Sequence, residues 1–458
     1  AGTGNVASGS RSFVGSGISN TASGTLSYIG GGDTNTASGC HSTIGGGISN
    51  TASGNCATIA GGLQNTVTTQ WSTIGGGYSN SISGNGGFLG GGQSNTVSGA
   101  YFAAVAGGNS NTASGYGSFV GAGSSNTASG ARSVVGGGQS NTASGCYTII
   151  AGGDGNASVA GARNAIGGGQ LNKICGTSTG CNTIGGGWTN CITIGFVNTI
   201  GGGYNNRIVG GSYHIIAGGY SNQISSGTES FIGSGGANSV SGNYSVVVGG
   251  QANTTSGVCS FIGGGRSGAA SGSHSTIAGG KTNTASGNYT AIGGGRVNTA
   301  SGIYSTVAGG ICNQATGGYS AILGGGNNTA TGTYSGVFGT GITASASCTF
   351  YSNNFCATSC MFATAFYETS DCRLKNIHNT FSAYDGIHFS QFSWKTDTEN
   401  KSCFGYIAQE VEKILPNAVH NNIEGYKQVD YNQVNTYKLS KLEDRIAKLE
   451  DKLKKYEA

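Results

Sequence analysis

Apolar and polar positions repeat with a fixed period over about three quarters of the chain. An aliphatic residue stands six positions before a recurring asparagine, as in Ile44 before Asn50 and Ile292 before Asn298. Successive asparagines are mostly 15 residues apart. A fixed short period is the signature of a solenoid whose repeats stack on one another. The aliphatic residues are therefore expected to form one apolar column inside the coil: Ile29, Ile44, Ile59, Ile74, Leu89, Val105, Val120, Val135, Ile150, Ile277, Ile292, Val307 and Ile322.

Each repeat predicts two short β-strands, as at residues 304–307 and 313–316, joined by glycine-rich turns. Glycine adopts the positive φ of tight turns at little cost, and small Ala and Ser at inner positions let the strands approach closely. The recurring asparagines predict a ladder in which each side-chain amide bonds to its neighbours on adjacent rungs. About 23 rungs at ~4.8 Å would give a rod of roughly 110 Å.

The repeats are looser between residues 156 and 238, where steps of 16 and 18 residues occur. We expect the additional residues to lie in loops, with Trp188, Tyr204 and Tyr213 as candidates for contact with a glycan on a host cell. Tyrosines recur at one repeat position from Tyr289 to Tyr334. This regular run predicts rings stacked on one another without a ligand.

Composition supports repetitive β-structure. The chain has 91 Gly but 1 Pro, and the glycines are clustered rather than placed at every third position, which excludes collagen. Only 8% of residues are charged and the net charge is +4, so self-repulsion is weak and disorder is not expected. The sequence shows no basic stripe of the kind that binds nucleic acid, and no apolar run approaches the ~20 residues of a membrane span. The predicted fold class is mainly β, a parallel β-solenoid with a small α+β domain after it.

Charge divides the chain into unlike parts. We expect a solenoid over 1–345, a connector over 346–369 and an intramolecular chaperone domain over 370–458 that ends in a coiled-coil helix at 437–458. The only acids before residue 343 are Asp33, Asp154 and Glu229. Cleavage of a polysaccharide needs two carboxylates about 5–9.5 Å apart, so these scattered acids argue against a depolymerase. The chain begins in mid-repeat, and we expect further residues before it.

The 13 cysteines are scattered over different repeat positions, which favours free thiols over a disulfide framework. Cys175 and Cys181 could close a loop through a disulfide, but a free pair is favoured. Zinc is a weaker alternative because no histidine accompanies the pair. No cofactor or metal site is predicted.

The C-terminal residues predict an amphipathic helix with a heptad seam, because apolar residues alternate in steps of three and four. A seam of about three heptads is marginal alone, and a single thin coil buries little apolar surface, so we expect a homotrimer. The alternative is a lone helix packed on its own chain. The seam consists of Leu439, Leu442, Ile446, Leu449, Leu453 and Tyr456.

Ordered motifs in about the last 90 residues resemble a known family. They are Ser-Asp-Cys-Arg-Leu-Lys at 370–375, Phe-Ser-Trp-Lys at 392–395, the segment 404–416 and Tyr-Lys-Gln-Val-Asp-Tyr at 426–431. Together they are similar to the endosialidase-type intramolecular chaperone (peptidase S74) domain of phage tail spikes and fibres. The resemblance implies a domain that trimerises, templates the preceding β-structure and then cuts itself off.

The resemblance also implies the residues of the cleavage. Ser370 would attack the carbonyl of Thr369, and the resulting ester would be hydrolysed by water. Lys375 would be the general base, a role that requires burial to lower the pKa of its amine. Asp371 and Arg373 would shape the turn.

Two alternatives to this dyad remain open. His378 could replace Lys375 as the base, although the resemblance points to the lysine. The motif could also persist for folding alone, with cleavage lost. In either case no external substrate is expected, so any enzymatic activity would be a single self-cleavage by a serine endopeptidase.

The repeat unit Tyr-Ser-Thr-Ile-Gly-Gly-Gly-x-x-Asn-Thr-Ala-Ser-Gly resembles the head repeats of trimeric autotransporter adhesins (YadA-like), although it is one residue longer than is typical. This resemblance implies a left-handed parallel β-roll in a threefold assembly. The two resemblances predict a homotrimeric viral fibre or tail spike at the virion surface that attaches to a host glycan or receptor. A bacterial surface adhesin and a polysaccharide depolymerase are the alternatives.

Overall fold

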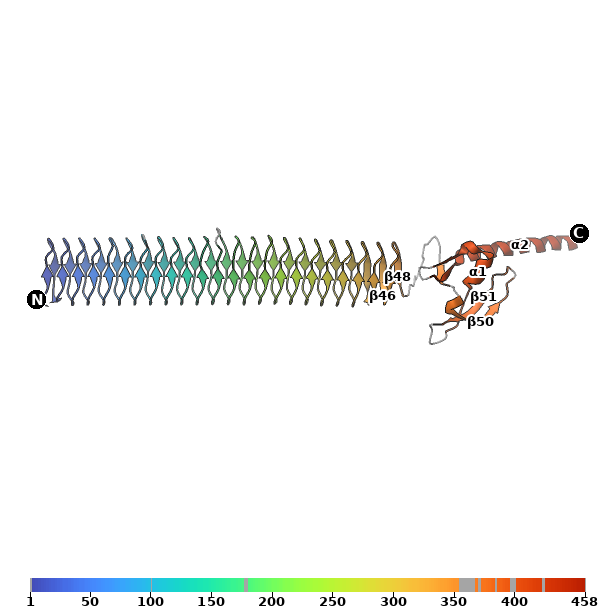
Figure 1. Ribbon diagram of the computed structural model, residues 1–458, viewed down its shortest axis with the longest axis horizontal. Helices are drawn as coiled ribbons and strands as arrows, with labels where there is room; N and C mark the ends of the chain where they lie inside the picture. Colours follow the sequence, from blue (N-terminus) through green and yellow to red (C-terminus); the bar gives the residue numbers. More distant parts are fainter. Residues whose placement is uncertain are drawn as a thin grey trace. The chain divides into compact units, whose positions relative to one another are not determined.

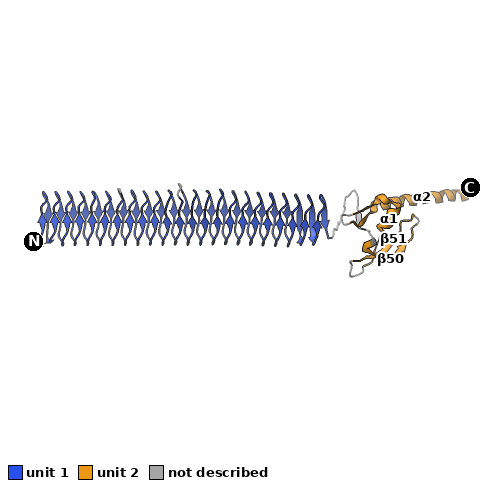
Figure 2. Cartoon of the chain, in the orientation of Figure 1, with its two compact units in different colours: residues 1–353 blue, residues 354–458 orange. Residues whose placement is uncertain are grey.

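The computed structural model describes residues 2–99, 101–176, 180–353, 367–369, 372–383, 385–395, 401–421 and 425–457. The chain divides into two compact units, residues 1–353 and residues 354–458, which are coloured separately in Figure 2.

The first unit is a parallel β-solenoid of about 23 rungs, as the sequence predicts (Figure 1). One sheet runs from β3 (Phe13–Val14) to β48 (Phe350–Ser352), and the other from β2 (Val6–Ala7) to β47 (Thr343–Ala344). Each strand pairs in parallel with the strand one rung further on, as β8 (Thr43–Ile44) does with β10 (Thr58–Ile59). Most strands span only two residues, and they lengthen near the end of the unit, at β44 (Ala321–Gly326) and β46 (Gly336–Thr340).

The core of the solenoid is a single column of side chains between the two sheets. In the first sheet the second residue of each short strand after β3 is a fully buried aliphatic residue, as at Ile44 and Ile59. Facing strands such as β7 (Thr36–Ala37) and β9 (Thr51–Ala52) bury a small alanine at the same depth. The predicted apolar column and the small inner residues opposite it are confirmed.

A ladder of buried asparagines runs along one turn of the solenoid, and Asn50 shows its bonding. Its backbone N–H donates to Oδ1 of Asn35 at 3.0 Å, and its own Oδ1 accepts the N–H of Asn65 at 2.9 Å. Its Nδ2 donates to the carbonyl oxygens of Gly46 at 3.1 Å and Gly62 at 2.8 Å. Each amide therefore joins three consecutive rungs, which confirms the predicted ladder and extends it to the backbone.

The looser repeats do not place their additional residues in irregular loops, so that expectation was wrong for the described rungs. Between β26 (Thr183–Ile184), β27 (Cys191–Ile192) and β28 (Thr199–Ile200) the strands follow at equal steps of eight residues. Both strands of such a rung bury an isoleucine. The additional residue completes a second turn like the first, with its own asparagine ladder, in which Asn198 N–H donates to Asn182 Oδ1 at 3.0 Å.

Two turn positions in most rungs hold residues other than glycine with positive φ, which the sequence analysis did not predict. Ser49 has φ 54° and His41 has φ 57°, and bulky residues such as Trp71 adopt the same conformation at the second position. The N–H groups of Ser49 and His41 donate to carbonyls on the preceding rung at 2.8 Å, opposite in direction to the strand N–H groups. These reversed bonds compensate for a backbone conformation that costs such residues about 1 kcal/mol or more.

The second unit is a small α+β fold with two antiparallel sheets. One has the order β49 (Tyr367–Thr369), β54 (Lys427–Asp430), β53 (Val419–Asn421), and the other β50 (Lys375–Phe381), β51 (Phe389–Trp394), β52 (Cys403–Gly405). Short 3-10 turns lie at η1 (Cys372–Leu374) and η2 (Pro416–Ala418), and the helices are α1 (Ala408–Ile414) and α2 (Tyr431–Glu457). The core comprises Ile387, Tyr406, Ala408, Val411, Ala418, Val429 and Val434.

The ten cysteines whose side chains are described have free thiols, including Cys175 and Cys181, so the disulfide alternative for this pair is not formed. Burial, and next the neighbouring Cys191, raise the pKa of the Cys175 thiol. Among the described residues no group of His, Cys, Asp and Glu is arranged to hold a metal ion. None of the described helices is long and apolar enough to cross a bilayer.

Candidate functional site

The backbone on both sides of the predicted cleavage point is held by strands. Thr369 ends β49, where it pairs with Gln428 of β54. Lys375 begins β50 directly after the η1 turn, and pairs with Trp394 of β51. Ser370 and Asp371, the predicted nucleophile and its neighbour, lie outside the described residues.

Lys375 is buried, with 4% of its surface exposed. Its Nζ donates to the backbone carbonyl of Tyr406 at 3.0 Å, and lies 3.8 Å from the ring centroid of Phe392 and 5.2 Å from that of Trp394. The two rings meet edge to face at 5.3 Å. The amine is therefore enclosed by two aromatic side chains of β51 and a carbonyl from the segment before α1.

The carbonyl and the ring faces hold the amine in one position, and burial separates it from water. The sequence motifs that supply Phe392, Trp394 and Tyr406 gave no indication that they meet around Lys375.

Arg373 anchors the η1 turn. Its Nη2 donates to the carbonyl of Gly425 at 2.6 Å, and its guanidinium carbon lies 5.0 Å from the ring centroid of Tyr426. Both partners directly precede β54, the strand that pairs with β49. The arginine thus connects the turn after the predicted cleavage point to the sheet that holds the residues before it.

His378, the alternative base, lies in β50 and is exposed. Its Nε2 is 3.0 Å from Oγ of Ser393 on β51. The structure therefore places His378 beside Ser393. Of the two candidate bases, Lys375 is the buried one.

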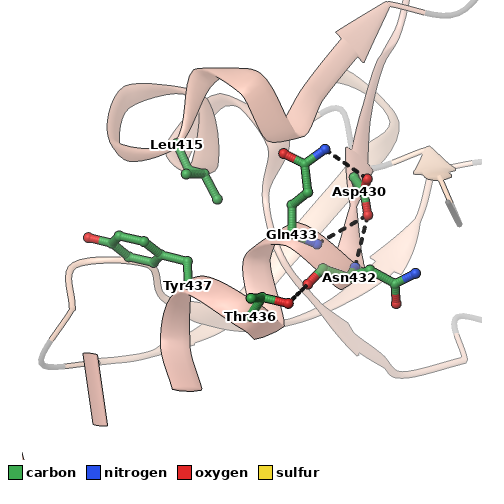
Figure 3. Close-up of a pocket in the computed structure, with 6 residues that line it drawn as sticks. All are labelled: Leu415, Asp430, Asn432, Gln433, Thr436 and Tyr437. Carbon is green, nitrogen blue, oxygen red and sulfur yellow. Dashed lines mark hydrogen bonds between the residues drawn. The ribbon is translucent and has the colours of Figure 1, made fainter. Parts of the chain in front are cut away.

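The first turns of α2 are fixed to the core of the second unit. Oδ1 of Asp430 accepts the N–H groups of Asn432 at 2.9 Å and Gln433 at 3.2 Å, and its Oδ2 accepts Nε2 of Gln433 at 3.0 Å (Figure 3). This is an N-terminal cap of the kind that stabilises helix starts by about 1 kcal/mol. One turn later Lys438 donates to the carbonyl of Ile387 at 2.7 Å and forms an ion pair with Asp385. The capping residues also line an open pocket with Leu415, Thr436 and Tyr437 (Figure 3).

Beyond Lys438 every described side chain of α2 is exposed. The apolar seam is exposed along its whole length, by 43% to 59% for its leucines and isoleucine and by 90% for Tyr456. The alternative of a helix packed on its own chain is therefore wrong for this segment. In the described part of the chain no residue covers the seam, which consists of Leu439, Leu442, Ile446, Leu449, Leu453 and Tyr456.

The aromatic positions on the solenoid follow two patterns. The predicted tyrosine column is confirmed: rings from Tyr289 to Tyr334 stack at 4.6–4.9 Å between centroids, and His274 continues the stack at 4.8 Å. Trp188 and Tyr204 are half exposed and lie on adjacent rungs, with ring centroids 5.0 Å apart. Tyr213 packs edge to face on Phe196 at 4.9 Å. The three predicted glycan-contact residues are thus exposed but not isolated.

Comparison with protein families places the second unit in a known class. Residues 370–420 match the model of the family described as the chaperone of endosialidase, peptidase S74. The match covers the motifs at 370–375, 392–395 and 404–416, and ends before Tyr426 and α2. A comparison with curated proteins found no significant match. The chain is therefore a long parallel β-solenoid followed by a C-terminal region that matches the endosialidase chaperone model, an arrangement that suggests a tail-fibre or tail-spike-like protein.

Proposed function

We propose that the protein is a homotrimeric fibre or spike of a phage tail, whose C-terminal domain directs folding of the solenoid and then releases itself by cutting the chain before Ser370. The family match at 370–420, directly after a solenoid, supports this role. The observation that carries the trimer is the seam of α2, which is apolar, in heptad register and exposed.

The seam supports association because its residues have no reason to be apolar in an isolated chain. Burying a leucine or isoleucine side chain stabilises an assembly by about 1.5–3 kcal/mol. Parallel helices would bring the same residues of each copy together, so the three solenoids would start in register. Parallel solenoid strands expose edges while they fold, and an early register mark limits wrong pairing.

The outer faces of the two solenoid sheets differ in a way that supports the same assembly. The second sheet presents mostly threonine to solvent, as at Thr51 in β9. The first sheet also presents threonine on some rungs, as at Thr43 in β8, but on others it presents exposed aromatic or aliphatic side chains, which suit contact with another copy of the chain. These residues are Phe13, Tyr28, Phe88, Phe119, Ile149, Ile215, Phe261 and Phe350.

Self-cleavage would proceed as an acyl transfer within the chain. Oγ of Ser370 attacks the carbonyl carbon of Thr369 while Lys375 accepts the hydroxyl proton. The bond between this carbon and the nitrogen of Ser370 breaks, the nitrogen receives the proton, and an ester joins Thr369 to Ser370 Oγ. Water then hydrolyses the ester. The buried and oriented amine of Lys375 supports this assignment, and the intact mass of the purified protein tests it.

Attachment to a host glycan through Trp188, Tyr204 and Tyr213 is proposed on their exposure alone. A glycan array would test this attachment. Unchanged binding after removal of the Trp188 and Tyr204 rings would contradict it.

A depolymerase receives no support, since Asp33 and Asp154 are eight rungs apart in one column, about 38 Å at ~4.8 Å per rung. A bacterial surface adhesin of the same build remains the second candidate, favoured only by the repeat motif.

A further inference from the structure

Three cations occupy the same turn position on three consecutive rungs. Arg266, Lys281 and Arg296 are joined in sequence by parallel β-bridges. Each backbone N–H donates to a glycine carbonyl on the next rung at 2.8–2.9 Å. The side chains are therefore anchored one rung apart, about 4.8 Å, in a row along the solenoid axis.

The charges of this basic row are not neutralised by the protein. All three side chains are exposed, and none has a hydrogen bond or ion pair in the described part of the chain. The acid nearest in sequence, Glu229, lies on the opposite turn of the solenoid. Like charges placed opposite each other on paired strands repel. The row thus weakens the solenoid locally unless an anion lies beside it.

A strip of open backbone accompanies the row. Gly264, Gly279 and Gly294 each stand two residues before a cation, and a Cβ added to any of them would meet no atom within 4 Å. None has a φ in the left-handed range, so a side chain could be accommodated there. The absence of side chains leaves a flat, uncovered surface next to three positive charges.

We propose that the basic row binds a linear acidic polysaccharide lying along the solenoid, with its carboxylates or sulfates on the cations and its sugar rings over the glycine strip. A polymer fits because the binding groups repeat along the axis. Arg266 and Arg296 are two rungs apart, about the length of a disaccharide, which suits a chain with one acidic sugar in each disaccharide. The nearest of the other solenoid cations, Arg207, lies about four rungs before Arg266, and no three of the others stand at one position on consecutive rungs. A second row of the kind that a nucleic-acid duplex would need is therefore not formed.

Repulsion between like charges also favours an outward position for the basic row in a threefold assembly. A threefold axis beside the row would bring three basic rows together. The site is therefore compatible with the proposed trimer, but it depends on neither trimerisation nor cleavage, which are measured separately.

Binding of the purified full chain to defined oligosaccharides tests the proposal. The probes are a heparin oligosaccharide with sulfates and carboxylates, a hyaluronan oligosaccharide with carboxylates only, and neutral dextran. We expect binding to one or both acidic probes, weakening as salt increases, and none to dextran. Arg266→Gln/Lys281→Gln/Arg296→Gln should bind at least tenfold more weakly. The control Arg11→Gln/Arg163→Gln/Arg207→Gln, which removes the same charge from scattered positions, should change binding less than twofold.

A second pair of variants tests the glycine strip without changing charge. Gly279→Leu/Gly294→Leu should cover the surface and weaken binding at least tenfold, whereas Gly46→Leu/Gly61→Leu covers equivalent positions far from the row and should have no effect. Thermal unfolding of each variant checks that the solenoid is intact. Binding to heparin alone would identify sulfate as the required group, and binding to both would show that carboxylate suffices. Unchanged binding by the basic-row variant, equal losses in both triple variants, or equal affinity for a DNA duplex of matched charge would overturn the proposal.

Discussion

The amine of Lys375 donates a hydrogen bond of 3.0 Å to the backbone carbonyl of Tyr406, so the predicted base is fixed by a segment 31 residues further along the chain. The motif that contains Tyr406 leads directly into α1, whose residues Ala408 and Val411 belong to the core of the second unit. The amine is therefore positioned only once this unit has folded. If the proposed cleavage occurs, this relationship would delay it until the second unit has folded.

Replacing Lys375 tests whether Lys375 or His378 is the general base. Arginine is permanently protonated and cannot accept the proton of Ser370, so Lys375→Arg should give a single uncleaved chain while trimers still form. His378→Ala should be cleaved like the wild type. Denaturing gels and light scattering measure the two properties. Cleavage in the Lys375→Arg protein, or its loss in His378→Ala, would assign the base to another residue.

The seam of α2 should determine assembly. Leu442→Asp/Ile446→Asp/Leu449→Asp places carboxylates where apolar side chains would be buried, at a cost of about 5 kcal/mol or more per chain. We expect monomers or aggregates in size-exclusion chromatography with light scattering. The control Ser440→Asp/Ala447→Asp/Lys454→Asp adds carboxylates to the same helix outside the seam and should remain trimeric. Soluble trimeric rods from the seam variant would show that the helix is dispensable.

Each asparagine of the ladder should contribute more to the stability of the solenoid than a half-buried side chain beside it. Asn50→Ala leaves the Gly46 carbonyl and the N–H of Asn65 without a partner and removes one of the two hydrogen bonds to the Gly62 carbonyl, which costs about 2–4 kcal/mol. Thr51→Ala on the neighbouring strand position removes only a half-buried side chain and should cost less than about 1 kcal/mol. Because repeat proteins unfold locally, hydrogen exchange of residues 35–65 is the suitable measurement. Equal protection in both variants would contradict the role of the ladder.

His214 replaces an asparagine in the second ladder and makes that part of the solenoid sensitive to acid. Its backbone N–H donates to Oδ1 of Asn198 at 2.9 Å, and its Nδ1 accepts the N–H of Ser230 at 3.2 Å. Burial lowers the pKa of His214 below its ordinary value of 6.5. The unfolded chain therefore binds the proton more readily, so stability is complete above pH 6.5 and falls as the pH decreases from there towards the folded pKa.

Hydrogen exchange of residues 198–230 between pH 7.5 and 5 measures this effect, after correction for the intrinsic exchange rate. Protection should decrease with acid in the wild type and stay nearly constant in His214→Asn, which restores the usual ladder residue. The same decrease in both proteins would show that His214 is not responsible.

The sequence predicts those features that depend on the period. Ile44 and Asn50 recur at fixed positions, so their burial and their ladder follow from stacking alone. The doubled ladder at Asn198 does not follow from a period of one asparagine per rung; its indication in the sequence is the step of eight residues from Ile184 to Ile192. The positive φ at Trp71 was missed because intrinsic preferences assign such turns to glycine, whereas here the hydrogen bond to the preceding rung determines the conformation.

The roles of Ser370 and Lys375 stay predictions that rest on the motif at 370–375. The contacts of Lys375 with Phe392, Trp394 and Tyr406 could not be predicted, because they depend on antiparallel pairing and on a connection between distant segments, which local patterns do not encode. The exposure of the α2 seam likewise depends on how the rest of the domain packs, which the heptad pattern does not reveal.

The most direct test of the central claim is the intact mass of the purified wild-type protein beside that of Ser370→Ala. We predict two wild-type fragments, one ending at Thr369 and one beginning at Ser370, and a single full-length chain from Ser370→Ala that still forms trimers. An uncleaved wild-type chain, a cut at another bond, or cleavage of the Ser370→Ala protein would contradict the account.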